Sequence, residues 1–284
     1  MKVSFTKMQG AANDYIYVDC FKETIDDPSS LAVAMSPRHF SVGADGLVLI
    51  MPSSVADARM RMFNADGSEG KMCGNAIRCV GKYVYDAGYA KKEVVTVETL
   101  SGIKTLKMKV EDGVAVGATV DMGIVTTDPK VIPISSEEPY VDKSLVIDGK
   151  DYKVTCVSVG NPHVVVYVDN VDDFDVFGVG SKFEKDAFFP ESVNTEFVEV
   201  VDSTHLKMRV WERGSGETYA CGTGASATVA ASCLNGLCPY DVPVEVKLLG
   251  GNLYIEVKKD LRVFMTGAAK KVYDGVYEYE DQGK

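Results

Sequence analysis

The chain has 284 residues, of which 46% are hydrophobic and 25% are charged, a composition typical of a globular protein with a full core. Its formal net charge of −11 argues against nucleic acid or an anionic membrane as a partner, because clustered Lys and Arg bind phosphate groups. No segment approaches the roughly 18 apolar residues of a membrane span, and no signal-peptide pattern is present at the start. Seven scattered cysteines without a Cys-x-x-Cys pair predict a reducing cytoplasm and no structural metal.

The first predicted element with a clear period is a helix after Cys73, in which apolar residues recur at helical spacing and Gly88 offers a C-terminal cap. Apolar residues alternate with polar ones at 106–110 and 114–116, which predicts half-buried strands. The same alternation recurs at 206–210 and 253–257. Between these, small apolar residues follow Cys221 up to Gly236. A helix without a polar face is usually buried.

The two halves of the chain resemble each other at an offset of about 149 positions. Chance similarity between strands could explain one match, but five matches in the same order, one of which contains Cys-Gly, favour an internal duplication. The matched segments are 6–10 with 156–160, 59–64 with 207–212, 72–75 with 220–223, 100–102 with 249–251, and 120–123 with 264–267. Each half is too long to be a unit of a solenoid, so we expect two similar domains.

The expected fold class is therefore α+β, with two pseudo-symmetric domains. Each domain is expected to be a strongly curved, mostly antiparallel sheet wrapped around a central helix. The N-terminal domain should span 1–118, carry Cys73 and be completed by the C-terminal segment 268–284. The C-terminal domain should span 119–267 and carry Cys221.

Cys73 and Cys221 occupy matching places, each before a glycine at the predicted start of a helix. A helix N-terminus carries partial positive charge and free backbone N–H groups, so we expect the thiol pKa to fall from about 8.5 toward neutrality. The same N–H groups can hold a carboxylate and the charge that develops beside it. The other five cysteines are interpreted as buried small hydrophobes.

Two such thiols suit the inversion of a carbon centre by proton transfer, which needs a base on one face and an acid on the other. If the duplication creates a pseudo-twofold, we expect the two helix starts to face one cleft. One cysteine would be a thiolate while the other is a thiol, and the reverse reaction would exchange their roles.

Five segments give the sequence its resemblance to the diaminopimelate epimerase family. These are residues 7–14 (KMQGAAND), 63–68 (FNADGS), 72–78 (MCGNAIR), 160–163 (GNPH) and 212–224 (ERGSGETYACGTG). The resemblance implies interconversion of LL- and meso-2,6-diaminopimelate, in lysine and peptidoglycan precursor synthesis. It also implies that the enzyme needs no cofactor, neither pyridoxal phosphate nor a metal ion, and that it is a cytoplasmic homodimer.

The resemblance also implies roles for residues around the catalytic pair, Cys73 and Cys221. Backbone and side-chain groups beside the cysteines should hold the carboxylate at the reacting centre: Gly74, Asn75, Gly222 and Thr223. Polar side chains elsewhere should hold the distal end of the substrate, where a guanidinium is the natural bidentate partner of a carboxylate: Asn64, Asn161, Asn194 and Arg213. Glu212 should accept from a substrate ammonium group. Asn13 and, in a supporting role, His163 should line the cleft.

The sequence departs from the family pattern at Ala12, where glycine is usual, and at Gly46, where many members carry glutamine. These departures bear on distal specificity rather than on the thiols. A cofactor-independent racemase of another amino acid, such as histidine or proline, is the nearest alternative function. An isomerase with a single acid/base group and a redox protein with a regulatory disulfide are the others.

Overall fold

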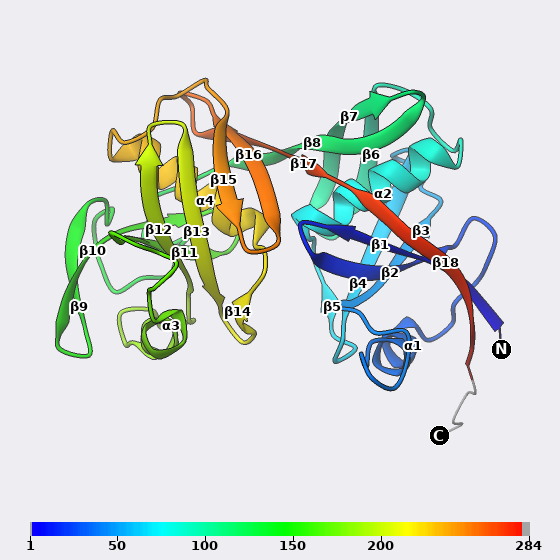
Figure 1. Cartoon of the computed structure of the whole chain (residues 1–284), viewed down its shortest axis with the longest axis horizontal. Helices are drawn as coiled ribbons and strands as arrows, with labels where there is room; N and C mark the ends of the chain where they lie inside the picture. The colour runs from blue at the N-terminus through cyan, green and yellow to red at the C-terminus, as the bar shows by residue number, and fades with distance from the viewer. Residues whose placement is uncertain (1, 280–284) are drawn as a thin grey trace. The chain divides into compact units, whose positions relative to one another are not determined.

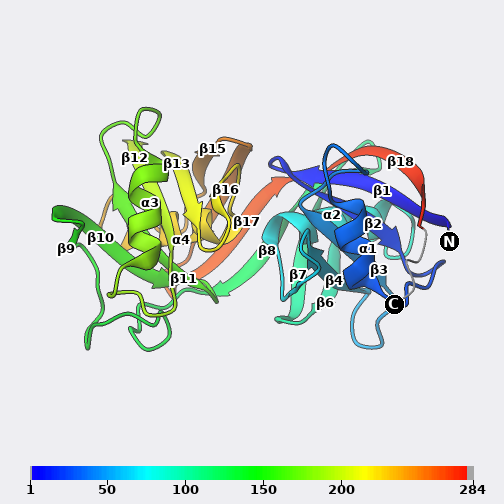
Figure 2. The same ribbon diagram turned by 90° about the horizontal axis from the view of Figure 1, so that it is seen from below.

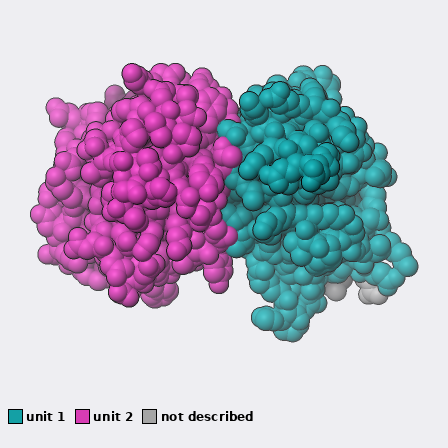
Figure 3. All heavy atoms as spheres, turned by 45° about the horizontal axis from the view of Figure 1, so that its top comes forward, with its two compact units in different colours: residues 1–120, 267–284 teal, residues 121–266 magenta. Residues whose placement is uncertain are grey.

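The computed structural model describes residues 2–279 and divides them into two compact units (Figures 1 and 3). The first unit contains the described residues up to Val120 and those from Gly267 onward, and the second contains Asp121–Thr266. The chain passes from the first unit to the second within strand β8 (Val114–Ile124) and returns within β17 (Arg262–Ala268). Within the described residues there are four helices, none long and apolar enough to cross a membrane.

The first unit is a sheet with two helices. Its elements in chain order are β1 (Lys2–Gly10), β2 (Asn13–Asp19), α1 (Pro28–Met35), β3 (Gly46–Met51), β4 (Ala58–Asn64), β5 (Glu69–Gly70), α2 (Gly74–Asp86), β6 (Val94–Thr99), β7 (Gly102–Glu111) and most of β8, with β18 (Lys270–Glu278) added from the end of the chain.

The second unit repeats this order. Its elements are β9 (Lys143–Ile147), β10 (Lys150–Ser158), β11 (Pro162–Tyr167), α3 (Val176–Lys185), β12 (Asn194–Asp202), β13 (His205–Glu212), β14 (Gly216–Thr218), α4 (Gly222–Leu234), β15 (Val244–Leu248), β16 (Gly251–Val257) and most of β17.

Strand pairing repeats as well, element for element. In the first unit β1–β2 and β3–β4 are antiparallel, whereas β2–β3 and β4–β6 are parallel. In the second unit β10–β11 and β12–β13 are antiparallel, whereas β11–β12 and β13–β15 are parallel. β18 pairs with β1 as β9 pairs with β10. The predicted duplicated α+β fold, mostly antiparallel, is confirmed.

Each sheet surrounds one buried helix. Helix α2 contacts β1, β2, β4, β6 and β7, and α4 contacts β10, β11, β12, β15 and β16. The α2 side chains of Ile77, Val80 and Val84 are fully buried, and the helix ends before Gly88, which adopts a positive φ of 82°. Helix α4 is buried on all sides, as its small apolar sequence predicts.

All four predicted strands are present, and the predicted inward-facing positions hold throughout β13 and β16, whereas in β7 they end before Val110, which is 37% exposed. Leu206, Met208 and Val210 of β13 alternate inward and are at most 2% exposed. Residues 253–257 behave in the same way in β16, with its three apolar side chains fully buried. In β8 the strand is present, but the buried position is Ala115, and Val114 is exposed.

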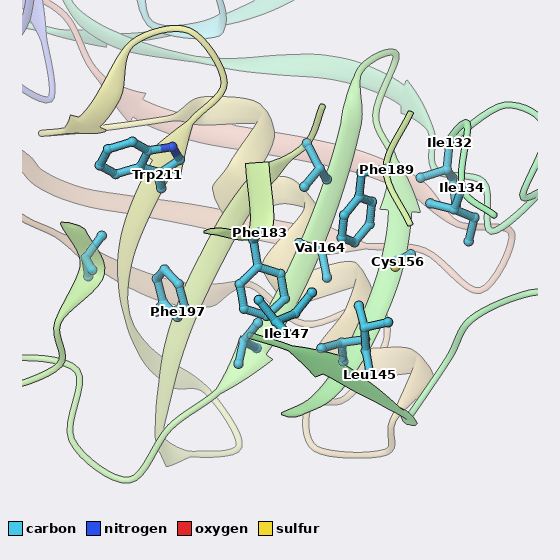
Figure 4. Close-up of a cluster of buried hydrophobic side chains, with 14 of the residues drawn as sticks. Ile132, Ile134, Leu145, Ile147, Cys156, Val164, Phe183, Phe189, Phe197 and Trp211 are labelled. Atoms are coloured by element: carbon cyan, nitrogen blue, oxygen red, sulfur yellow. The ribbon is translucent and has the colours of Figure 1, made fainter. Parts of the chain in front are cut away.

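Helices α1 and α3 are matching outer elements, each beginning at an aspartate whose carboxylate accepts from a first-turn N–H: Asp27 from Ser30 and Asp175 from Gly178. Helix α3 contacts β12 and β13 (Figure 2). Beneath it lies an aromatic core in which Phe183, Phe197 and Trp211 are buried with the side chains drawn in Figure 4. This packing fixes β12 and β13, which carry several of the candidate site residues.

Candidate active site

Both candidate cysteines are the N-cap residues of the two buried helices. Cys73 precedes α2 and Cys221 precedes α4, and both have extended backbones, with φ of −132° and −120°. In each helix a glycine follows the cysteine, and Asn75 or Thr223 comes next. The first-turn N–H groups of both helices are therefore at the sulfur-bearing ends, as the sequence predicts.

The sulfur of Cys221 is almost completely enclosed, because the residue is 5% exposed. The backbone N–H of Gly224 donates to Sγ at 3.3 Å, so the thiol takes the capping role usually filled by Ser or Asp. The Oγ1 atom of Thr223 lies 3.4 Å from the same sulfur.

Burial raises the pKa of the Cys221 thiol well above its usual 9.0, and negative charge on Glu212 or Glu196 acts in the same direction. Hydrogen bonds from Thr223 and Gly224 act in the opposite direction but do not outweigh burial. The expectation that the helix N-terminus lowers this thiol pKa toward neutrality is therefore wrong for Cys221. Desolvation dominates, and the neutral thiol is favoured at neutral pH.

Cys73 is more accessible and belongs to a different polar network. Its Sγ donates to Oδ1 of Asn13 at 3.3 Å, and the Nδ2 of Asn13 donates to Asp45 at 2.7 Å. Arg38 bridges Asp45 and Asp14, with Nη2 to carboxylate distances of 2.7 and 2.6 Å. The amide that contacts the sulfur is thus held by charged groups outside the helix.

An ion pair between the buried Lys7 and the partly buried Asp14 supports this network. The Lys7 ammonium lies 2.5 Å from a carboxylate oxygen of Asp14 and also donates to the carbonyl of Gly43. Burial acts to raise the pKa of Asp14, but hydrogen bonds from Arg38 and Lys7 outweigh it and hold that pKa below its ordinary value of 3.8. The pair therefore stabilises the fold at and above the ordinary aspartate pKa. That contribution is lost as the pH falls through the lowered pKa of the folded protein.

We expect Lys7→Met to lower the free energy of unfolding by about 2 kcal/mol, because it removes the ammonium that bonds the partly buried Asp14 carboxylate and the carbonyl of Gly43, while Arg38 still pairs with Asp14. Urea denaturation at pH 7 measures this. Lys2→Met on the same strand is the control, since its ion pair with Glu278 is exposed and should contribute less than about 1 kcal/mol. Equal stability of the two variants would contradict a stabilising role for the buried pair.

In the second unit, polar side chains gather around α4 and the ends of β11, β12 and β13. His163 is fully buried, with Nδ1 2.7 Å from Oε1 of Glu196 and Nε2 3.0 Å from Oδ1 of Asn161. The Nδ2 of Asn161 donates to Thr223 at 3.3 Å. The structure thus joins three predicted site residues to Cys221 through hydrogen bonds.

Three more of the predicted residues lie at the ends of β12 and β13: Asn194 begins β12, Glu212 ends β13 and Arg213 follows it. Asn194 is buried and accepts from the backbone N–H of Arg213 at 2.9 Å. The exposed guanidinium of Arg213 donates to the carbonyl of Glu191, also at 2.9 Å. Glu212 accepts from the Thr218 hydroxyl at 2.5 Å. Asn194 therefore fixes the backbone that presents Arg213.

Two predicted asparagines of the first unit lie in different surroundings. Asn75, in the first turn of α2, is buried, and its Oδ1 accepts from Arg78 at 3.0 Å. Arg78 is itself fully buried and also donates to the carbonyls of Gly74 and Ala268. Asn64 is exposed at the end of β4 and donates to the Ser68 hydroxyl at 2.9 Å.

Comparison with known proteins decides the family. The family model described as diaminopimelate epimerase matches residues 5–127 and 155–272. The diaminopimelate epimerase of Acetivibrio thermocellus is 57% identical over 273 residues, which cover 95% of this chain and 97% of the relative. A Methanococcus maripaludis protein of the same name is 50% identical, with 96% and 99% covered. The chain belongs to the diaminopimelate epimerase family.

More distant solved structures share the fold of this diaminopimelate epimerase family member. A hydroxyproline epimerase from Agrobacterium vitis matches with a TM-score of 0.71 at 14% identity, covering 97% of this chain and 91% of that one. A PhzF-family phenazine biosynthesis protein from Bacillus anthracis matches with a TM-score of 0.70 at 18% identity, covering 98% and 100%. The resemblance drawn from the cysteine motifs is confirmed, and a racemase of histidine or proline is not favoured.

The departures at Ala12 and Gly46 from the usual family pattern lie in different local settings. Ala11 and Ala12 form the two-residue turn between β1 and β2, both at positive φ (56° and 62°), where glycine or asparagine is favoured. At Gly46 a Cβ atom would lie 2.0 Å from the carbonyl oxygen of Phe63, so this backbone leaves no room for a side chain. No distal contact can come from a side chain at position 46.

Sequence reasoning missed several residues that hold the site together. Glu196 and Arg78 are buried charged residues that contact predicted site residues. Lys7 and Asp14 lie inside a family motif, but nothing in their spacing shows that they pair, because they meet across the β1–β2 hairpin. For Glu196, the only available signal is an acidic residue inside an apolar strand sequence.

Proposed function

We propose that this protein interconverts LL- and meso-2,6-diaminopimelate, with Cys73 and Cys221 as the two acid/base groups. Membership of the diaminopimelate epimerase family over nearly the whole chain carries the proposal. The position of both cysteines as N-cap residues of matching buried helices supports it. One thiolate removes the α-proton, and the other cysteine delivers a proton to the opposite face.

The proposed chemistry depends on stabilising charge at the α-carbon. An amino-acid α-proton is very weakly acidic, so donors must be aimed at the carboxylate beside it. The first-turn N–H groups that follow each cysteine can fill this role, namely those of Gly74, Asn75, Gly222 and Thr223. Exclusion of water strengthens these interactions. The proposed mechanism uses groups of this chain alone, without pyridoxal phosphate or metal.

The distal half of the substrate would be bound by the other polar residues. Arg213 would pair with the distal carboxylate, because its guanidinium is exposed and offers two parallel donors. Glu212 would accept from an ammonium group. Side-chain amides would complete the set: Asn13, Asn64, Asn161 and Asn194. His163 would act in support, from its buried position.

The duplication assigns one thiol to each half. We infer that the functional domains are 1–118 with 268–284, and 119–267, and that the protein is a cytoplasmic homodimer. Its reaction would serve lysine and peptidoglycan precursor synthesis.

The assay that tests this function is epimerisation of LL-diaminopimelate, followed by chiral chromatography, in parallel with L-histidine and L-proline. We expect the protein to convert diaminopimelate and neither of the other two amino acids. The LL and meso forms should reach near-equal amounts after correction for the two equivalent α-carbons of the LL form. Activity should survive dialysis against EDTA and treatment with hydroxylamine, which captures pyridoxal phosphate. Racemisation of proline or histidine without action on diaminopimelate would contradict the proposal.

A further inference from the structure

Glu196 is a buried acid that has no part in the proposed proton transfer or substrate binding. It lies on β12 beside His163 of the parallel strand β11, and both side chains are 0% exposed. Its Oε1 contacts His163 Nδ1 at 2.7 Å, while Oε2 is buried without a hydrogen-bond partner among the residues that the structure describes. A buried carboxylate with an unpartnered oxygen is costly, and a proton on the pair reduces that cost.

A continuous hydrogen-bond chain runs from Glu196 to the sulfur of Cys221. His163 Nε2 lies 3.0 Å from Asn161 Oδ1, and Asn161 Nδ2 lies 3.3 Å from Thr223 Oγ1. Thr223 Oγ1 in turn lies 3.4 Å from Cys221 Sγ. All these groups belong to the second unit.

The orientation of the Asn161 amide sets the direction of the whole chain. Because Oδ1 of Asn161 can only accept, Nε2 of His163 must carry the hydrogen and donate. The Oγ1 atom of Thr223 accepts a hydrogen bond from Nδ2 of Asn161. The hydroxyl hydrogen of Thr223 is therefore available to donate to Sγ of Cys221. Together with the Gly224 N–H, the sulfur then receives two donors, the arrangement that stabilises a thiolate.

The number of protons on the histidine–glutamate pair follows from the same geometry. With a hydrogen on Nε2, a neutral His163 has a bare Nδ1, which can approach Glu196 at 2.7 Å only if that carboxyl is protonated. If His163 instead carries both hydrogens, it is an imidazolium beside a carboxylate. In either case the pair is neutral overall and holds one proton more than a carboxylate beside a neutral imidazole.

We propose that Glu196 and His163 hold one shared proton, and that Glu196 is the positioning residue that directs this hydrogen-bond chain toward Cys221. The catalytic part of the inference rests on the proposed role of Cys221 as an acid/base group. The consequence is electrostatic: a neutral pair adds no negative charge beside a sulfur that must become a thiolate.

The groups that face Glu196 agree with this assignment. They are His163 on β11, Cys156 on β10, Glu212 on β13 and Cys221 at the start of α4. Burial raises the pKa of Glu196, His163 opposes this, and the charge of Glu212 adds to it, with a net upward shift. A charged Glu196 would also raise the pKa of Cys221.

Gly224 shows how near the carboxyl lies to the cysteine. A Cβ atom at this position would lie 2.8 Å from Oε1 of Glu196 and 3.3 Å from Sγ of Cys221. The glutamate and the thiol therefore share one small space at the helix start. A second negative charge there would oppose thiolate formation directly.

Nitrogen-15 NMR of the histidine side chains tests the shared proton without using enzyme activity. The chain has three histidines, so His39→Gln and His205→Gln identify the signals that belong to His163. At pH 7 we expect Nε2 of His163 to be protonated, with Nδ1 either bare or also protonated. A protonated Nδ1 with a bare Nε2 would overturn the proposal.

Variants of Glu196 test the positioning role. In Glu196→Gln the amide can donate to Nδ1, so we expect kcat within about threefold of wild type, whereas Glu196→Ala should lose about tenfold. Glu199→Gln, on the same strand and paired with Lys207, is the control for removing a carboxylate, and it should be unaffected. Equal loss in Glu196→Gln and Glu196→Ala, or no loss in either, would contradict the role.

Alkylation of Cys221 reports the charge of the pair directly. In a Cys73→Ala background, the rate of reaction with iodoacetamide at pH 9 should change less than about twofold in Glu196→Gln, because a neutral pair is replaced by a neutral pair. A tenfold faster reaction would mean that the substitution had lowered the pKa of Cys221 by about one unit, as the removal of a nearby negative charge does. That result would overturn the shared proton. Both the NMR and the alkylation results stand even if diaminopimelate is not the substrate, so failure of the function and failure of this inference are distinguishable.

Discussion

Replacing either catalytic cysteine by serine should lower the rate of diaminopimelate epimerisation by at least about a hundredfold, the lower range for a general acid or base. Serine keeps the size and the N-cap geometry of Cys73 and Cys221, but its hydroxyl is far too weak an acid to supply a base at neutral pH. The loss should therefore appear in kcat, with little change in KM. Turnover of the LL and meso substrates, measured separately, gives both values.

Cys79→Ser and Cys233→Ser are the matched controls, since both cysteines are buried in the same two units and lie outside the proposed chemistry. They are expected to lose some stability but to retain kcat. If Cys73→Ser or Cys221→Ser turned over at the wild-type rate, that thiol would not be an acid/base group.

Replacing Arg213 by methionine should lower kcat/KM for diaminopimelate by about a hundredfold or more, because it removes the proposed charge-assisted, bidentate partner of the distal carboxylate. The exposed guanidinium donates a hydrogen bond to the carbonyl of Glu191, and Asn194 accepts from the backbone N–H of Arg213. Arg213→Lys should recover only part of the loss, since an ammonium cannot offer two parallel donors.

Arg262→Met is the comparison for this variant. Arg262 is also in the second unit and is paired with Asp121, and it has no proposed role in binding. We expect its kcat/KM to stay within about threefold of wild type. An unchanged kcat/KM in Arg213→Met would show that the guanidinium does not bind the substrate and that other residues bind the distal carboxylate.

The large elements were predictable because their signals are local. Helix α4 follows from a run of small apolar residues between Cys221 and Gly236, and β13 and β16 follow from strict alternation. The duplication could be predicted because five segments recur in the same order. Such a recurrence is found by comparing the sequence with itself and needs no knowledge of contacts.

The electrostatics of the site were not predictable in the same way. The helix N-terminus suggested a lowered pKa for Cys221, but the enclosure of the sulfur by α4 and the neighbouring strands raises it, and burial depends on the whole fold. Glu196 meets His163 across two parallel strands, and Lys7 meets Asp14 across a hairpin. Such pairings depend on register, which no motif in this sequence specifies.

Deuterium labelling during the first turnovers tests the two-thiol mechanism most directly. LL-diaminopimelate is converted in deuterium oxide, the reaction is stopped early, and label at the α-carbon is measured in the meso product and in the recovered substrate. Two separate acid/base groups predict label in nearly every product molecule and almost none in the unreacted LL form, because the proton that leaves and the one that arrives use different sulfurs. Comparable label in both compounds at this stage would mean that one group serves both faces, and would contradict the two-thiol mechanism.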